Sequence, residues 1–123
     1  MKYRLIVIEN SLSEKSILNK YKILSKTFFE KGTPQESFMY KMEIPAKDIQ
    51  IVTELLKQNL KYPYYAHLYH EDSHNNSLIV IFSDQIFHTS KTNFTDAVTY
   101  GISHGIPKEQ MDIQPRDVHD ERW

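Results

Sequence analysis

Residues 64–90, YYAHLYHEDSHNNSLIVIFSDQIFHTS, decide the fold of this chain. Three short runs within them, at 64–70, 78–83 and 86–90, are rich in aromatic and β-branched residues, and polar turn residues separate the runs. Such runs favour strands, and short connections between them favour antiparallel neighbours. The stretch is therefore predicted to form a three-stranded meander.

The register of the meander follows if its first hairpin closes across residues 71–76. Residues that oppose each other in an antiparallel pair share one face of the sheet. One face is then largely aromatic and carries a histidine; its members are Tyr65, His67, Tyr69, Leu78, Val80, Phe82, Phe87 and Thr89. The other face is aliphatic, with Ala66, Leu68, Ile79 and Ile81. A slip of one residue would exchange the two faces.

One helix is predicted before the meander in the sequence and a second helix after it. Pro45 is tolerated in the first turn of a helix, and Pro63 ends that helix. Its apolar residues recur at helical spacing, at Ile49, Val52, Leu55, Leu56 and Leu60. Asn93 is a plausible cap for the second helix, Gly105 ends it in a left-handed conformation, and Pro107 prevents its continuation. The apolar side of this second helix is expected to be Phe94, Ala97, Val98 and Ile102.

Further strands are predicted at residues 3–9, 21–30 and 38–44, the last two as a hairpin. A short helix over 11–20 is expected before that hairpin, and a helix over 17–24 competes with the start of its first strand. Residues 111–115 are expected to form a last short strand. Residues 115–123 are charged and are expected to form a loosely ordered tail.

This order separates the helices from runs of strands, which implies an α+β sandwich with a mainly antiparallel sheet. With 123 residues, of which 40% are hydrophobic, the chain is expected to form one domain over residues 1–123. Both main helices are expected on the aliphatic face of the sheet. The aromatic face is expected to stay open.

Charge and composition restrict the function. Fifteen Lys and Arg against sixteen Asp and Glu give a formal charge of -1, so no global field attracts nucleic acid or an anionic membrane. The aromatic face lacks the basic residues that accompany base stacking. Because there are no cysteines, the chain has no disulfides or thiolate nucleophiles, and a cytoplasmic location is expected. The apolar run Leu5–Ile8 is too short for a signal peptide or a membrane span.

The histidines of the meander do not predict a metal site. Zinc needs three or four ligands that converge at about 2 Å, but His67 and His70 are an odd step apart and point to opposite faces of one strand. His74 belongs to a polar turn that is typical of an exposed hairpin connection. Three glycines in the whole chain leave little backbone to bind phosphate groups. No metal or cofactor is therefore expected.

The leading hypothesis is a small domain that binds a second copy of itself or a small ligand through the aromatic face. The residues expected to carry this binding are Tyr65, His67, Tyr69, Phe82 and Phe87. If the face forms a homodimer, protonation of His67 is expected to weaken it at acid pH. The alternative is a small enzyme in which His67 acts as general acid or base and Tyr65 or Tyr69 orients it. A further interpretation gives His67 no catalytic role: the side chain is half-buried, and the neighbouring hydroxyls satisfy its nitrogens.

Three segments carry a resemblance to small uncharacterised bacterial proteins. They are YYAHLYHED, SLIVIFSDQIFHTS and FTDAVTYGISHGIPKEQMDIQP, with a hairpin, a helix and a GIPxEQxDI-like ending. The resemblance covers roughly residues 37–115. It implies a ferredoxin-like α+β domain with two helices on one face of the sheet. It implies no activity and no functional residue, because such proteins have no assigned activity.

Overall fold

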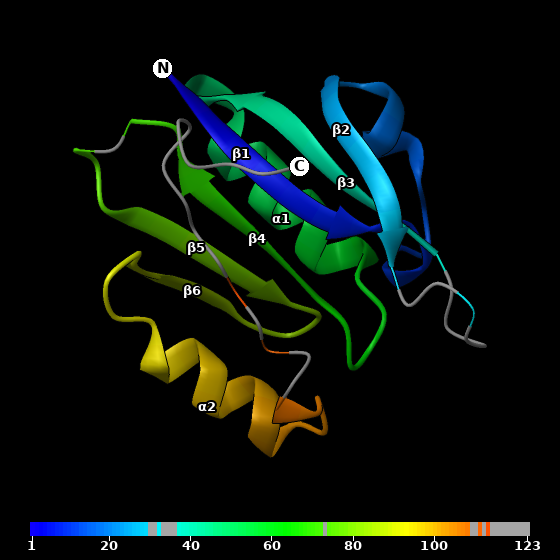
Figure 1. Cartoon of the computed structure of the whole chain (residues 1–123), viewed down its shortest axis with the longest axis vertical. Coiled ribbons are helices and arrows are strands. Elements are labelled where there is room, and N and C mark those ends of the chain that lie inside the picture. The colour runs from blue at the N-terminus through cyan, green and yellow to red at the C-terminus, as the bar shows by residue number, and fades with distance from the viewer. Residues whose placement is uncertain (30–31, 33–36, 73, 109–110, 112, 114–123) are drawn as a thin grey trace.

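The computed structural model describes residues 1–29, 32, 37–72, 74–108, 111 and 113. Within these residues, six strands form one sheet in the order β2-β3-β1-β4-β5-β6, and all neighbouring strands are antiparallel (Figure 1). The strands are β1 (Lys2–Ile8), β2 (Lys22–Phe29), β3 (Ser37–Pro45), β4 (Tyr65–His70), β5 (Ser77–Phe82) and β6 (Ile86–Ser90). The α-helices are α1 (Ile49–Asn59) and α2 (Thr95–Ser103). The α+β class and the antiparallel sheet are thus confirmed.

The meander is formed by β4, β5 and β6, and its predicted register is confirmed. Tyr65 lies opposite Phe82, and His67 lies opposite Val80. Phe87 of β6 continues the row of His67, because it pairs with Val80 from the other side. The two predicted sets of side chains therefore do lie on opposite faces.

The aliphatic face is covered by α1, which crosses behind β1 and β4 in Figure 1. Val52 and Leu56 of α1 are each 1% exposed and belong to the same cluster as the buried strand residues. That cluster includes Leu5 and Val7 of β1, Tyr40, Met42 and Ile44 of β3, Ala66 and Leu68 of β4, and Ile79 and Ile81 of β5. Full burial of one such aliphatic side chain stabilises the fold by about 2 kcal/mol. This face is the main core of the molecule.

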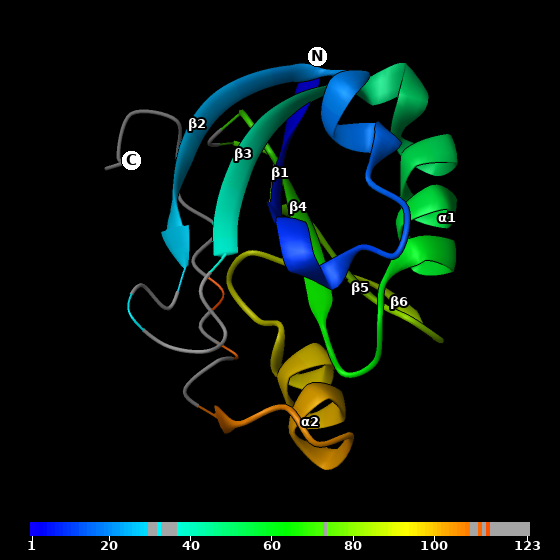
Figure 2. The same cartoon turned by 90° about the vertical axis from the view of Figure 1, so that its right-hand side faces the viewer.

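The expectation that both helices cover one face is wrong. Ala97 of α2 is fully buried in a second cluster together with Tyr69, Val80 and Phe82, which point away from α1. Figure 2 shows α1 and α2 on different sides of the sheet. Aromatic side chains each carry a large apolar area, so a second layer over this face removes much apolar surface from water.

The chain turns back after α2 and adds to this second layer. Gly105 has φ +96, and the amide of Ile106 donates to the carbonyl of Gly101 over 3.1 Å, as in a Schellman motif. This confirms the predicted helix end. Ile106, Met111 and Ile113 are each at most 6% exposed and join the second cluster.

The ferredoxin-like expectation is not confirmed. A ferredoxin-like domain alternates its elements as βαββαβ. Here three strands precede α1 and three more precede α2, and β1 lies between β3 and β4 in the middle of the sheet. The pattern of strands and helices along the sequence gives the class of fold, but several strand orders satisfy it.

The remaining differences concern short elements. Two 3-10 segments, Glu9–Ser11 and Ser16–Asn19, stand where a short helix over 11–20 was expected. The competing helix over 17–24 gives way to β2. Of the last strand expected over 111–115, the described residues Met111 and Ile113 lie outside any strand. Residues 114–123, which include the expected tail, are outside the described residues. Among the helices of the described residues, none has the length and apolar character needed to cross a bilayer.

Candidate functional site

The structure places the five predicted site residues on one face, as expected. The rings of Tyr65, His67 and Tyr69 form a row along β4, with centroids 6.4 Å apart at each step and planes 25° apart. Phe82 lies beside Tyr65 at 6.0 Å, and Phe87 meets Phe82 nearly at right angles at 5.9 Å. The rings of the five predicted residues therefore form one cluster.

The face is not open, however. His67 is 6% exposed, Tyr69 2% and Phe82 4%, whereas Tyr65 and Phe87 are half-buried. The second layer accounts for much of this burial, because Tyr69 and Phe82 pack in one cluster with residues of α2 and of the segment that follows it. The prediction of an exposed aromatic surface is thus wrong.

His67 is a buried neutral side chain near physiological pH. Burial lowers the pKa of His67 from 6.5 to about 4, because the charged imidazolium loses its hydration. The rings of Tyr65 and Tyr69 lie on either side of the His67 ring along β4, each with its centroid 6.4 Å away. At pH 7 the imidazole of His67 is almost entirely unprotonated, so it has no proton to give as a general acid. Its low pKa also makes it a weak general base.

Tyr100 of α2 and His104, which caps the C-terminal end of that helix, extend the aromatic cluster, and sequence reasoning selected neither. The Tyr100 ring lies 4.8 Å from that of Phe82 and 5.2 Å from that of Phe87. His104 stacks on Tyr100 at 3.9 Å with planes 23° apart. The signal was available in the sequence, because residues four apart on a helix are neighbours on its surface.

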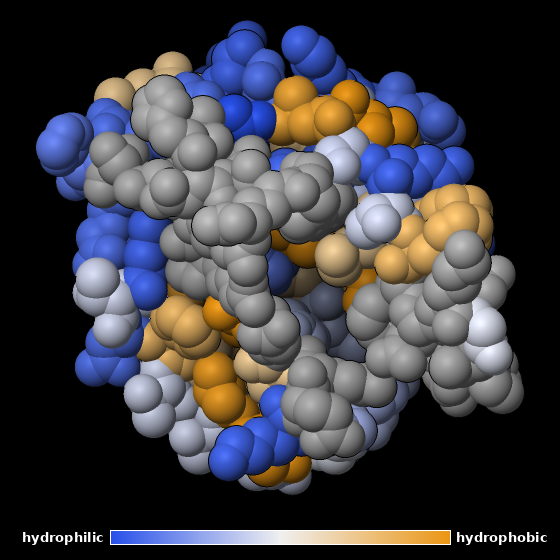
Figure 3. Space-filling model, in the orientation of Figure 1, coloured by the Kyte–Doolittle hydropathy of each residue, from blue (hydrophilic) through white to orange (hydrophobic). Residues whose placement is uncertain are grey.

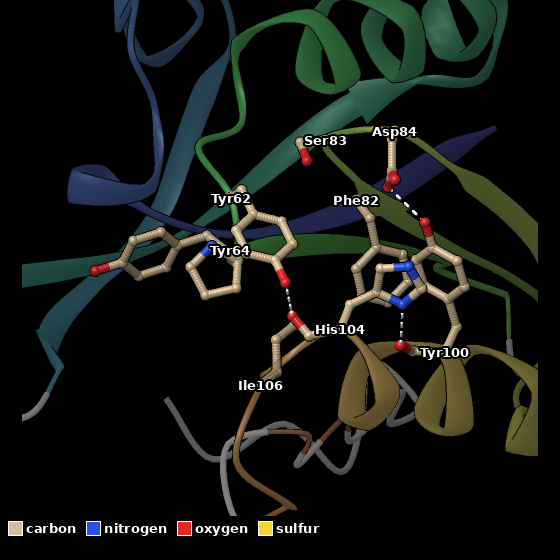
Figure 4. A pocket seen from close by; sticks show the side chains of 9 residues that line it. Tyr62, Tyr64, Phe82, Ser83, Asp84, Tyr100, His104 and Ile106 are labelled. Atoms are coloured by element: carbon tan, nitrogen blue, oxygen red, sulfur yellow. Dashed lines mark hydrogen bonds between the residues drawn. The ribbon is translucent and has the colours of Figure 1, made fainter.

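A small cleft opens where the cluster reaches the surface (Figure 4). Its walls come from the loop between α1 and β4, from the end of β5 and from the C-terminal end of α2. The lining residues are Tyr62, Pro63, Tyr64, Phe82, Ser83, Asp84, Tyr100, His104 and Ile106. Phe82 thus links the cleft to the predicted face.

Hydrogen bonds fix the polar groups of this cleft. The Tyr100 hydroxyl donates to Asp84 Oδ1 over 2.5 Å, and this bond, with burial and the carboxylate charge, raises the pKa of Tyr100 to about 12. The Tyr62 hydroxyl donates to the carbonyl of His104. Nδ1 of His104 lies 2.9 Å from the carbonyl of Tyr100. If Nδ1 donates to that carbonyl, Nε2 is the ring's acceptor.

Gly101 allows α2 to lie close enough to form this cleft. A Cβ atom at this position would lie 2.6 Å from Sδ of Met111 and 3.2 Å from the Phe82 ring. Because the glycine has no side chain, both neighbours can approach the helix backbone. The predicted apolar side of α2 is correspondingly shifted: Gly101 is buried, whereas Ile102 is 41% exposed. Figure 3 shows hydrophobic residues among hydrophilic ones at the surface near α2.

The other histidine of β4 has a structural role on the opposite face. The ring of His70 meets that of Tyr3 edge-on at 5.0 Å, and its Nδ1 accepts from the amide of Asp72 over 3.0 Å. Nζ of Lys91 donates to the carbonyls of His70 and Asp72. The polar turn is thus tied to Lys91, the residue that follows β6. In the part of the chain that the structure describes, no three His, Asp or Glu side chains gather as metal ligands would.

No family model, no curated protein and no solved structure matches this chain.

Proposed function

We propose that this chain is a binding domain that takes a small ligand in the cleft between α2 and the end of β5. One observation carries the proposal: aromatic side chains from three separate segments, among them Tyr62, Phe82 and Tyr100, converge on this cleft. Ligand sites are typically concave, mostly apolar and lined by aromatic residues with a few fixed polar groups. Asp84 and His104 supply such groups here.

This proposal moves the expected site along the aromatic face. Phe82 remains part of it as a lining residue, and Phe87 supports it from outside the cleft through its contact with Tyr100. Tyr69 is buried within the chain and has almost no surface to offer a ligand, and His67 has little more. Tyr65 is half-buried beside Phe82 and is not one of the residues that line the cleft.

The other expectations stay predictions. An enzyme that uses His67 as general acid or base must overcome a pKa of about 4. A homodimer through the aromatic face must rely on half-buried residues such as Tyr65 and Phe87. The cytoplasmic location and the likeness to a bacterial family with a ferredoxin-like domain rest on the sequence alone.

The test is a fragment screen by chemical-shift mapping on the ¹⁵N-labelled chain. We expect fragments with small aromatic or apolar groups to shift amide signals around Asp84 and His104. Tyr62→Leu should weaken these fragments, whereas Phe28→Leu should not, because Phe28 is a similarly exposed aromatic residue on the distant strand β2. Hits that gather elsewhere, or equal effects of the two variants, would reject the proposed site.

A further inference from the structure

We infer that β6 pairs along its free edge with β6 of a second copy of this chain, so that the two sheets join across a two-fold axis at Phe87. This surface is separate from the cleft, and the inference does not rest on the proposed function. β6 and β2 are the outermost strands of the sheet (Figure 1). An edge strand presents unpaired backbone groups that can bind another strand.

The β2 edge carries features that discourage such pairing. Lys22 and Lys26 belong to this strand, and its register with β3 shifts between Ile23 and Ser25. Lysines and bulges block an edge because they add charge and twist the strand. Residues 86–90 of β6 include no Lys, Arg, Asp, Glu or Pro, and the register of β6 with β5 is regular throughout. The β6 edge is therefore the one that is open to another strand.

The direction of the backbone groups in β6 follows from its hydrogen bonds to β5. The amide of Phe82 donates to the carbonyl of Gln85 over 2.7 Å, and the amide of Lys91 donates to the carbonyl of Asn76 over 2.9 Å. Bonded and non-bonded pairs alternate along an antiparallel ladder. The odd-numbered residues of β6 therefore direct their backbone groups toward β5, and the even-numbered residues direct theirs toward the free edge.

The even-numbered residues of β6 are Ile86, His88 and Ser90. The Ser90 carbonyl accepts from the amide of Asn93 over 3.3 Å, in the turn that follows the strand. Within the part of the chain that the structure describes, the outward amides and carbonyls of Ile86 and His88 have no hydrogen-bond partner. The free edge therefore offers a donor and an acceptor on each of these two residues.

A second copy of β6 matches these groups completely. When two antiparallel copies pair about Phe87, Ile86 of each copy lies opposite His88 of the other, and each such pair exchanges both of its hydrogen bonds. A two-fold interface uses the same patch on both chains, as this pairing does. A longer unrelated strand would instead meet Asn93 beside Ser90 and leave its own backbone groups unpaired there. The edge therefore fits a second copy better than an unrelated strand.

The side chains at this edge fit the same arrangement. Ile86 and Phe87 are large and apolar, yet both are only half-buried. The Phe87 ring packs on Phe82 and Tyr100 of its own chain. Residues that face each other in a non-hydrogen-bonded pair have Cα atoms about 4.5 Å apart, so the two Phe87 side chains would meet across the axis. On the other face of the sheet, Ile86 would pack beside His88 of the second copy.

Sedimentation velocity of the full chain from about 10 µM to about 1 mM tests the association, because so small an interface gives a weak dimer. We expect the sedimentation coefficient of the wild type to rise with concentration. His88→Pro removes an amide that only the second copy uses, and edge strands tolerate proline at such positions. This variant should stay monomeric. His88→Gln keeps the amide and is the matched control, which should associate like the wild type.

Cysteine cross-linking tests the register, since the chain has no cysteine of its own. Phe87→Cys places two thiols at the two-fold axis, where Cα atoms about 4.5 Å apart allow a disulfide. Phe28→Cys is the control for random collisions, because Phe28 is 49% exposed on β2. With oxidised glutathione as the oxidant, we expect Phe87→Cys to form the linked dimer about tenfold faster than Phe28→Cys.

Three results would overturn the inference. The first is a wild type whose sedimentation coefficient does not change with concentration, and the second is equal association of folded His88→Pro and His88→Gln. The third is equal cross-linking of Phe87→Cys and Phe28→Cys. If His88→Pro does not fold, the sedimentation of the wild type and the cross-linking rates decide. The fragment screen of the cleft is independent of all three results, so the dimer and the ligand site can fail separately.

Discussion

The two faces of this sheet are built from different chemistry. The face under α1 is closed by aliphatic residues such as Leu5, Met42 and Leu68, each with no exposed surface. The face under α2 mixes aromatic rings with a histidine, and its outer part ends in the cleft beside Asp84. The first arrangement offers packing alone, whereas the second brings titratable and aromatic groups to the edge of the structure. The second face is therefore the better candidate for a functional site.

The largest expected effect breaks the packing of the first face. Leu68→Ala should lower the free energy of unfolding by about 2 to 5 kcal/mol, because it removes apolar contacts and leaves a cavity under α1. The equivalent change on the second face, Leu78→Ala, should cost less, because the short helix α2 can settle into the vacated space. Urea denaturation measures both, and Ile51→Ala, on the exposed side of α1, is the control.

If Leu78→Ala proves as costly as Leu68→Ala, the second layer is as rigid as the first. The proposed difference between the faces would then be one of composition only.

The next effect concerns pH. The pKa of His67 is lowered in the folded chain to about 4, so between pH 6.5 and 4 the unfolded chain binds a proton that the folded chain does not. The free energy of unfolding should therefore fall by about 2 kcal/mol as the pH decreases from about 6.5 to about 5. Urea denaturation of the wild type and of His67→Phe at several pH values measures this slope.

In His67→Phe the slope over this range should largely disappear, whereas the exposed residue His88, changed to Gln, should leave it in place. A slope that persists in His67→Phe would show that His67 is solvated, and the burial of this face would have to be revised.

A smaller effect tests how closely α2 approaches the sheet. Gly101→Ala gains about 1 kcal/mol of helix propensity but forces Met111 and Phe82 to move, which typically costs about 1 to 3 kcal/mol. We expect a net loss of about 1 kcal/mol. Hydrogen exchange should show faster opening of α2 while β1 and β4 stay protected, and the exposed position Thr99, changed to Ala, should show neither effect.

The smallest effect concerns the bond between Tyr100 and Asp84. Tyr100→Phe should lower stability by about 0.5 kcal/mol, because the bond is near the surface and the Asp84 carboxylate that loses its donor stays accessible to water. Asp84→Asn removes the charge and replaces the carboxylate by a weaker amide acceptor, so the pKa of Tyr100, which Asp84 raises to about 12, should fall toward 10. Ultraviolet titration of the tyrosines measures it, and an unchanged high pKa in Asp84→Asn would contradict the contact.

Local pattern was enough to predict the meander and its register. Alternation along β4 and β5 fixes which side chains share a face, so the residues that lie on the same face as Tyr65 and His67 were predictable. The pattern does not say what lies above each face. That depends on the direction the chain takes after β6, which no periodicity records, and so α2 was placed on the wrong side.

The candidate site was predictable only in part, for the same reason. Phe82 and Phe87 were found because they belong to the meander, whereas Tyr62 and His104 come from segments that meet only after the fold has formed. Gly101 was overlooked because a search for apolar side chains does not count glycine, although its missing side chain is what lets α2 approach the sheet.

The central position of β1 has a consequence for how the chain folds. This first strand pairs with β3 on one edge and with β4 on the other, and both partners come much later in the sequence. During synthesis on the ribosome, β1 therefore waits with both edges unpaired until its partners emerge. Long sequence separation between partners gives a high contact order, so we expect slow, cooperative folding and a need for protection of the nascent strand.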